Sequence, residues 1–156
     1  MPDSLTETYA AAAKFLREQS TLALATVGAD GLPCVAPLFY VCAAEGLILY
    51  WLSSPESKHS VNLTREAHVA ATVYPAVRDW QAIRGLQMEG MAEAVSDEAK
   101  RQRVLALYRA KFKLPEQFDA EIERSMLYEF RPLWLRWLDN GEKFGHKAEI
   151  HLAHDQ

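Results

Sequence analysis

Hydrophobic residues recur along this chain at two spacings, and the change of spacing marks where helix gives way to strand. Residues 4–20 carry apolar side chains at helical intervals. Residues 21–53 instead alternate or run apolar over short stretches, which turn signals at Gly28–Gly31 and Ala44–Gly46 interrupt. We therefore predict one helix and then a three-stranded antiparallel meander. Its strands are expected at 21–27, 32–42 and 46–53.

The second half of the chain alternates between the two spacings. A Ser-Pro step at Ser54–Pro55 is typical of a helix start, and strands and helices follow in turn. The elements predicted are a short helix at 55–64, strands at 68–74 and 82–95, a helix from residue 96, a weaker helix at 115–124, a strand at 126–138 and a mixed last segment at 144–152.

Two features of the predicted strands bear on how the sheet closes. Pro33 and Pro37 favour an edge or a kink for the second strand. Gly85 and Gly90 within the long strand 82–95 indicate a bulge, a bend or a close approach of another backbone or ligand. Short antiparallel hairpins close readily into a barrel. The fold class predicted is α+β: an antiparallel split β-barrel of six or seven strands, with an N-terminal helix and a helical pair before the last strands.

Length and charge narrow the functional classes. The 156 residues fit one domain, residues 1–156, and the formal net charge of −4 without a basic run disfavours nucleic-acid binding. No uninterrupted apolar run reaches the roughly 18 residues of a membrane span. Acidic residues near the N-terminus are unlike a secretory signal, so we expect a cytoplasmic protein. Cys34 and Cys42 are too far apart along one strand to form a disulfide.

The segment from Leu49 to His59 carries the most chemical information. A strand leads into a capped helix whose start bears serine hydroxyls and Lys58. Hydroxyl donors, free backbone N–H groups and a positive charge suit a phosphate group. The alternative interpretation is an ordinary helix cap without a ligand.

Four pieces of the chain, in order, resemble the FMN-binding split-barrel superfamily named after pyridoxamine 5'-phosphate oxidase. They are Leu24–Thr26 with Asp30–Tyr40, Leu49–Trp51 with Ser57–His59 and Asn62–Leu63, Val69–Val73, and Ile83–Ala92. Ile83–Gln87, Leu138–Asn140 and Phe144–Lys147 are similar to the poorly characterised YhbP-like branch.

This resemblance implies a homodimer with FMN at the interface between its subunits. It places Ser53, Ser57, Lys58 and His59 at the flavin phosphate, and Ala36, Pro37 and Leu38 along the isoalloxazine ring. It also places Trp80, Gln81 and Gln87 near the pocket, with Trp134 and Trp137 as a possible aromatic wall. Because Trp134 and Trp137 are three residues apart on a strand, they should face opposite sides.

The chain departs from the oxidase itself at two places. Residues 32–42 contain no Lys or Arg, and the oxidase's arginine-rich C-terminal segment is missing. We therefore expect an FMN-dependent oxidoreductase acting on an unknown small molecule, and not pyridoxamine-phosphate oxidase. No catalytic side chain or metal site stands out. Two alternatives stay open: a non-catalytic dimer with weak or lost flavin binding, and a haem-binding split barrel that would use His146 or His151.

Overall fold

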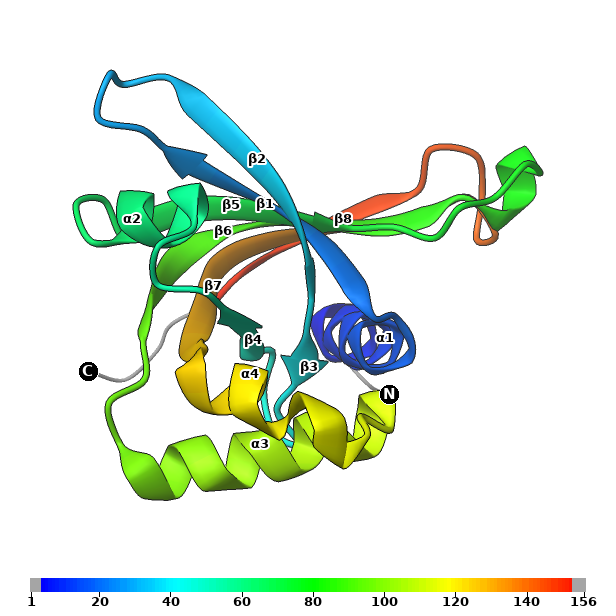
Figure 1. Ribbon diagram of the computed structural model, residues 1–156. Helices are drawn as coiled ribbons and strands as arrows, with labels where there is room; N and C mark the ends of the chain where they lie inside the picture. The colour runs from blue at the N-terminus through cyan, green and yellow to red at the C-terminus, as the bar shows by residue number, and fades with distance from the viewer. Residues whose placement is uncertain (1–3, 153–156) are drawn as a thin grey trace.

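Eight strands form one antiparallel sheet in the computed structural model, which describes residues 4–152 (Figure 1). The strand order is β2-β1-β5-β6-β7-β4-β3, and β8 pairs with the free part of β7. The strands are β1 (Thr21–Val27), β2 (Pro33–Phe39), β3 (Val41–Cys42), β4 (Leu49–Ser53), β5 (His68–Val73), β6 (Arg84–Ala94), β7 (Met126–Asp139) and β8 (Lys147–His151). This curled, incompletely closed sheet confirms the expected split-barrel class.

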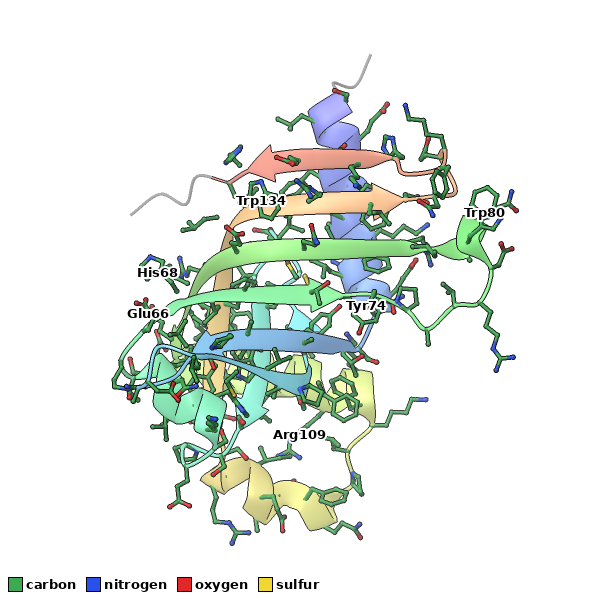
Figure 2. All side chains as sticks on the ribbon, turned by 90° about the horizontal axis from the view of Figure 1, so that it is seen from above. Glu66, His68, Tyr74, Trp80, Arg109 and Trp134 are labelled. Carbon is green, nitrogen blue, oxygen red and sulfur yellow. The ribbon has the colours of Figure 1, made fainter. Side chains whose placement is uncertain are left out.

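The helices gather mainly on the concave side of this sheet (Figure 1). They are α1 (Ser4–Glu18), α2 (Lys58–Leu63), α3 (Glu98–Phe112) and α4 (Asp119–Arg124), with single 3-10 turns η1 (Trp80–Ala82) and η2 (Glu116–Phe118). Helix α1 lies behind strands β5 to β8 in Figure 2 and closes the main core, where Phe15 packs edge-on against Trp137 at 5.1 Å between ring centroids. None of the helices within residues 4–152 has the length and apolarity that crossing a bilayer requires.

The three strands predicted over residues 21–53 pair antiparallel in the expected order, but the second strand is not continuous and breaks at Tyr40 into β2 and β3. The Tyr40 side chain is fully buried, and its hydroxyl donates a 2.7 Å hydrogen bond to the carbonyl oxygen of Leu16 in α1. The chain after Tyr40 leaves β1 and forms β3, which pairs with β4. Strand β4 pairs with β3 along one edge and with β7 along the other. The break also explains why eight strands are present where six or seven were expected.

Strand β7 organises the sheet, because three strands pair with it. Its first half pairs with β4, its second half with β8, and β6 follows it along the other edge. The register between β6 and β7 shifts at Glu89/Gly90, so Gly90 lies opposite Pro132 and Glu89 opposite Trp134. This irregularity confirms that a glycine inside the long strand marks a bulge.

The buried carboxylate of Glu129 links helix α3 to the first half of β7, which pairs with β4. Glu129 accepts hydrogen bonds from Tyr50 Oη and Lys100 Nζ, both at 2.9 Å, and from Arg131 Nε at 2.5 Å. Burial raises the pKa of Glu129, but the hydrogen bonds from Lys100, Arg131 and Tyr50 outweigh it and hold that pKa below the usual range. The ionised carboxylate is therefore fully partnered, as a buried charge must be.

The two faces of the sheet differ sharply. Trp137 points into the core beneath α1, whereas Trp134 lies on the opposite face, which confirms that the two tryptophans face opposite sides. Figure 2 looks onto that second face, where no helix covers strands β5 to β8. We call it the uncovered face.

We predict that Gly90→Ala lowers the free energy of unfolding by at least about 2 kcal/mol, through overpacking of the backbone. An added Cβ would lie 2.1 Å from the carbonyl oxygen of Arg131 and 2.8 Å from the Cα of Pro132, so the two strands would have to separate. Chemical denaturation measures the effect.

Gly85→Ala on the same strand is the control, because its added Cβ would come only within 3.2 Å of the Val73 carbonyl oxygen. Equal losses for the two substitutions would contradict the role assigned to Gly90.

Candidate functional site

Three of the residues predicted to hold a phosphate meet at the end of β4. His59 Nε2 lies 2.5 Å from Ser53 Oγ and 3.1 Å from Ser57 Oγ, and the two hydroxyl oxygens are 3.4 Å apart. All three side chains are half-buried. We call this group the Ser-His cluster. It presents two hydroxyls and one imidazole nitrogen toward a common point.

Helix α2 holds the Ser-His cluster in place, and it begins later than predicted. Its N-cap is Ser57, whose hydroxyl accepts from the backbone N–H of Ser60, and not Ser54. Ser54 instead caps the preceding turn, accepting from the N–H of Glu56 at 3.2 Å. The helix is fastened to the sheet by Asn62, which donates a buried 3.0 Å hydrogen bond to Thr26 Oγ1.

The charges around the Ser-His cluster are few. Burial lowers the pKa of His59, so its imidazole is neutral at neutral pH. The ammonium of Lys58 is exposed and takes part in none of the hydrogen bonds or ion pairs among residues 4–152. The cluster therefore offers neutral hydrogen-bonding groups and one free cation.

Strand β2 is an edge strand, as its prolines predicted, and only one of its three candidate residues presents a free backbone group. The backbone N–H of Tyr40 donates to Ser20 O, so the even-numbered residues Ala36 and Leu38 direct their backbone groups toward β1. Pro37 points its carbonyl away from β1 toward the free edge. Contacts of β2 with both β4 and α2 bring this strand close to the Ser-His cluster.

Trp80 lies far from these residues. The β5–β6 and β7–β8 connections project together as an arm at the opposite end of the sheet from α2, and Figure 2 shows Trp80 at its tip. Asn140 joins the two connections: its Nδ2 donates to Trp80 O at 2.9 Å and its Oδ1 accepts from Gly145 N at 3.0 Å. Phe144 packs against the Trp80 ring with centroids 5.7 Å apart. Neighbouring Gln81 lies in the same turn.

Gln87 lies in the middle of the uncovered face, away from the Ser-His cluster. It faces Thr72 on one side and Arg136 on the other, and these residues line a cavity of about 460 Å³. Arg136 is held by Glu149, whose Oε1 accepts from Nε at 3.0 Å and from Nη2 at 2.6 Å. One chain thus brings Ser53, Ser57 and His59 together, and keeps Trp80 and Gln87 apart from them.

Sequence reasoning missed a second polar pair, Glu66 and His68, at the rim of the uncovered face (Figure 2). Glu66 Oε1 accepts a 2.7 Å hydrogen bond from His68 Nδ1 and a 3.0 Å hydrogen bond from the His68 backbone N–H. The sequence does contain a sign of this pair: a glutamate lies two residues before a histidine, and that histidine is the first residue of a strand. Residues 4–152 contain no group of three or more metal-ligating side chains.

The profile of the family described as Pyridoxamine 5'-phosphate oxidase matches residues 9–138, most of the chain. The chain belongs to the pyridoxamine 5'-phosphate oxidase family. Family membership agrees with the split barrel and its order of elements.

Relatives of known sequence or structure extend this assignment. The chain is 31% identical over 140 residues to a UPF0306 protein of Cronobacter sakazakii, covering 88% of this chain and 90% of that one. A conserved hypothetical protein of Mycobacterium tuberculosis shares the fold, with a TM-score of 0.75, 20% identity, and coverage of 93% and 91%. The haem storage protein HutZ of Vibrio cholerae matches with a TM-score of 0.64, 26% identity, and coverage of 76% and 85%.

We predict that His59 titrates below the ordinary histidine value of about 6.5, because burial disfavours its charged form. The unfolded chain then takes up this proton more readily than the folded one. Stability conferred by neutral His59 is therefore present above the ordinary value and is lost as the pH falls through it. Proton NMR titration of the folded protein measures the pKa directly.

The control for this titration is His59→Gln, whose free energy of unfolding should fall less steeply between about pH 7 and pH 5. A folded-state pKa at or above the ordinary value would show that the Ser-His cluster is not shielded from water.

Proposed function

We propose that the protein is a homodimeric FMN-binding oxidoreductase of the pyridoxamine 5'-phosphate oxidase family that acts on a small molecule other than pyridoxamine phosphate. The proposal rests on one observation: within one chain, the candidate flavin residues lie in two separate groups. Ser53, Ser57 and His59 meet at the N-terminus of α2, whereas Trp80 projects at the far end of the sheet. One chain cannot close these two groups around one ligand, but two copies can.

The uncovered face supports pairing with a second copy. The outward positions of an antiparallel strand facing water are usually polar, yet three of the four in β1, Ala23, Ala25 and Val27, are apolar, and neighbouring β2 adds Val35, which is 66% exposed. An exposed apolar sheet face of this kind marks an interaction surface. Covering it with the same face of another chain removes apolar area from water on both.

The charges on this face suit a two-fold arrangement. Glu66 and Glu89 lie toward one end, beside the cavity that His68 lines. At the arm end a cavity of about 400 Å³ is lined on this face by Lys147 and by no carboxylate of the described residues. An isologous pairing that runs the two copies in opposite directions sets the acidic end of one against the basic end of the other.

The residues at the proposed flavin site have separable roles. Lys58 supplies the positive charge for the phosphate, the Ser53 hydroxyl donates a hydrogen bond to it, and neutral His59 holds that hydroxyl in position. The carbonyl oxygen of Pro37 at the free edge of β2 is an acceptor for a ring N–H. A bound flavin supplies hydride and electron transfer itself, so the protein needs to bind, orient and shield it.

We predict that the purified protein binds FMN and that Lys58→Ala weakens this binding about tenfold, the loss of one charge-assisted contact to phosphate. Quenching of FMN fluorescence measures the affinity. Lys14→Ala is the matched control. Lys14 is an exposed lysine on α1, and its ion pair with Glu18 is a long one, at 3.9 Å. Unchanged FMN affinity in the Lys58 variant would mean that the phosphate lies elsewhere.

We further predict that Lys58→Ala and Trp80→Ala complement each other when the two variants are unfolded, mixed and refolded together. If each flavin site takes Lys58 from one copy and Trp80 from the other, a mixed dimer contains one intact site and one doubly impaired site. FMN titration should then show a tight fraction that neither variant shows alone. If no tight fraction appears, a flavin site does not combine Lys58 of one copy with Trp80 of the other.

Haem binding is the second candidate function, because the matched HutZ is described as a haem storage protein. His151 ends β8 opposite Trp134 and is exposed, whereas His146 is half-buried in the turn before β8. The visible spectrum separates the candidates: flavin bands support the first, and a Soret band after haem addition supports the second. A colourless protein that ignores both ligands would instead favour a non-catalytic dimer.

A further inference from the structure

The uncovered face contains a cavity for which the proposed flavin site has no use. Its volume is about 410 Å³, and strands β1, β5, β6 and β7 all contribute to it. Ala25 and Ala70 are small enough to leave the floor open, and Val27, Leu133 and Trp134 supply apolar and aromatic walls. This size and lining are typical of a small-molecule pocket.

The polar groups of this cavity converge from two strands. His68 lies at the start of β5, and Glu89 lies on β6 beside the bulge. The hydrogen bonds from His68 lower the pKa of Glu66, so Glu66 is an ionised, acceptor-only group at neutral pH. The hydrogen shared with it must therefore sit on His68 Nδ1, and Nε2 is the ring nitrogen left for a ligand.

The charge of the cavity is negative. Glu89 lines it, Glu66 stands behind His68, and no lysine or arginine of the described residues lines it. Two adjoining cavities each contain one arginine: Arg136, which the carboxylate of Glu149 already matches, and Arg65, which lies beyond His68 next to Glu66. The Trp134 indole adds an electron-rich ring to the same space; such rings favour cationic groups, and the Arg136 guanidinium already lies over this one, 5.5 Å from its centroid.

We propose that this cavity binds a planar organic cation, such as an aromatic ring that carries an amidine, guanidine or ammonium group. The ring packs between Trp134, Leu133 and Val27, and the charged N–H groups donate to the carboxylate of Glu89 and to His68 Nε2. Glu66 acts through His68 by fixing its proton on Nδ1. The site is complete within one chain and is independent of flavin.

A second copy that covers the centre of the uncovered face would leave the rim of this cavity to be reached from the side. Figure 2 shows His68 and Glu66 at the rim of the sheet, so the polar end of the cavity opens at the edge of the uncovered face. A ligand therefore enters past His68.

Benzamidine is the probe, tested by isothermal titration calorimetry on the full-length protein as purified. We expect benzamidine to bind at least about tenfold more tightly than benzamide, its neutral analogue of the same shape, through the charge-assisted contact to Glu89. Benzoate, an anion of similar size, should not bind. Equal binding of benzamidine and benzamide, or tighter binding of benzoate, would overturn the proposal.

Matched variants locate the site. Glu89→Gln keeps the size of the side chain and removes its charge, so benzamidine affinity should fall about tenfold. Glu93→Gln removes a carboxylate from the same strand outside the cavity, and it should bind benzamidine like the unaltered protein. Equal effects of the two substitutions would mean that only the overall charge matters.

His68→Gln tests the second polar contact and should weaken benzamidine binding while leaving benzamide binding unchanged. FMN titration of the same samples is read separately. Loss of FMN binding with benzamidine binding retained rejects the flavin proposal alone, and the reverse result rejects this one alone.

Discussion

The close approach of two backbones at Gly90 is the constraint on which the shape of this protein depends. With no side chain on Gly90, the carbonyl of Arg131 and the Cα of Pro132 come within the space that a Cβ would occupy. The register shift there lets β7 change partners along its length, from β4 to β8, while β6 follows it throughout. The curl of the sheet, and with it the separation of core and uncovered face, depends on this point.

Local patterns predicted most of the fold, and long-range contacts decided the rest. Strands β1 and β5 and the bulge at Gly90 follow from alternation and from glycine placement. The break at Tyr40 does not, because the buried Tyr40 side chain is bonded to Leu16, a residue distant in sequence. Likewise Ser54–Pro55 and Ser57 both suit a helix start. The choice of Ser57 depends on which hydroxyl reaches a backbone N–H three residues on.

The candidate site was predictable where its residues are close in sequence. Ser57 and His59 are separated by one residue and meet Ser53 across a single turn, so the sequence placed them together correctly. Trp80 and Gln87 lie on elements whose direction is set by the whole sheet, and no local pattern records that they point away from α2. The partners of Glu129 come from three separate elements and leave no motif.

The free edge of β2 has a consequence for the solubility of the chain. Residues 33, 35, 37 and 39 direct their backbone groups away from β1, and two of the four are prolines. An incoming strand would find two N–H donors, at Val35 and Phe39, where a regular edge of this length offers four. Pairing of this edge with another strand is thereby weakened. The prolines keep their carbonyl oxygens, so the edge offers more acceptors to a small ligand than donors to another sheet.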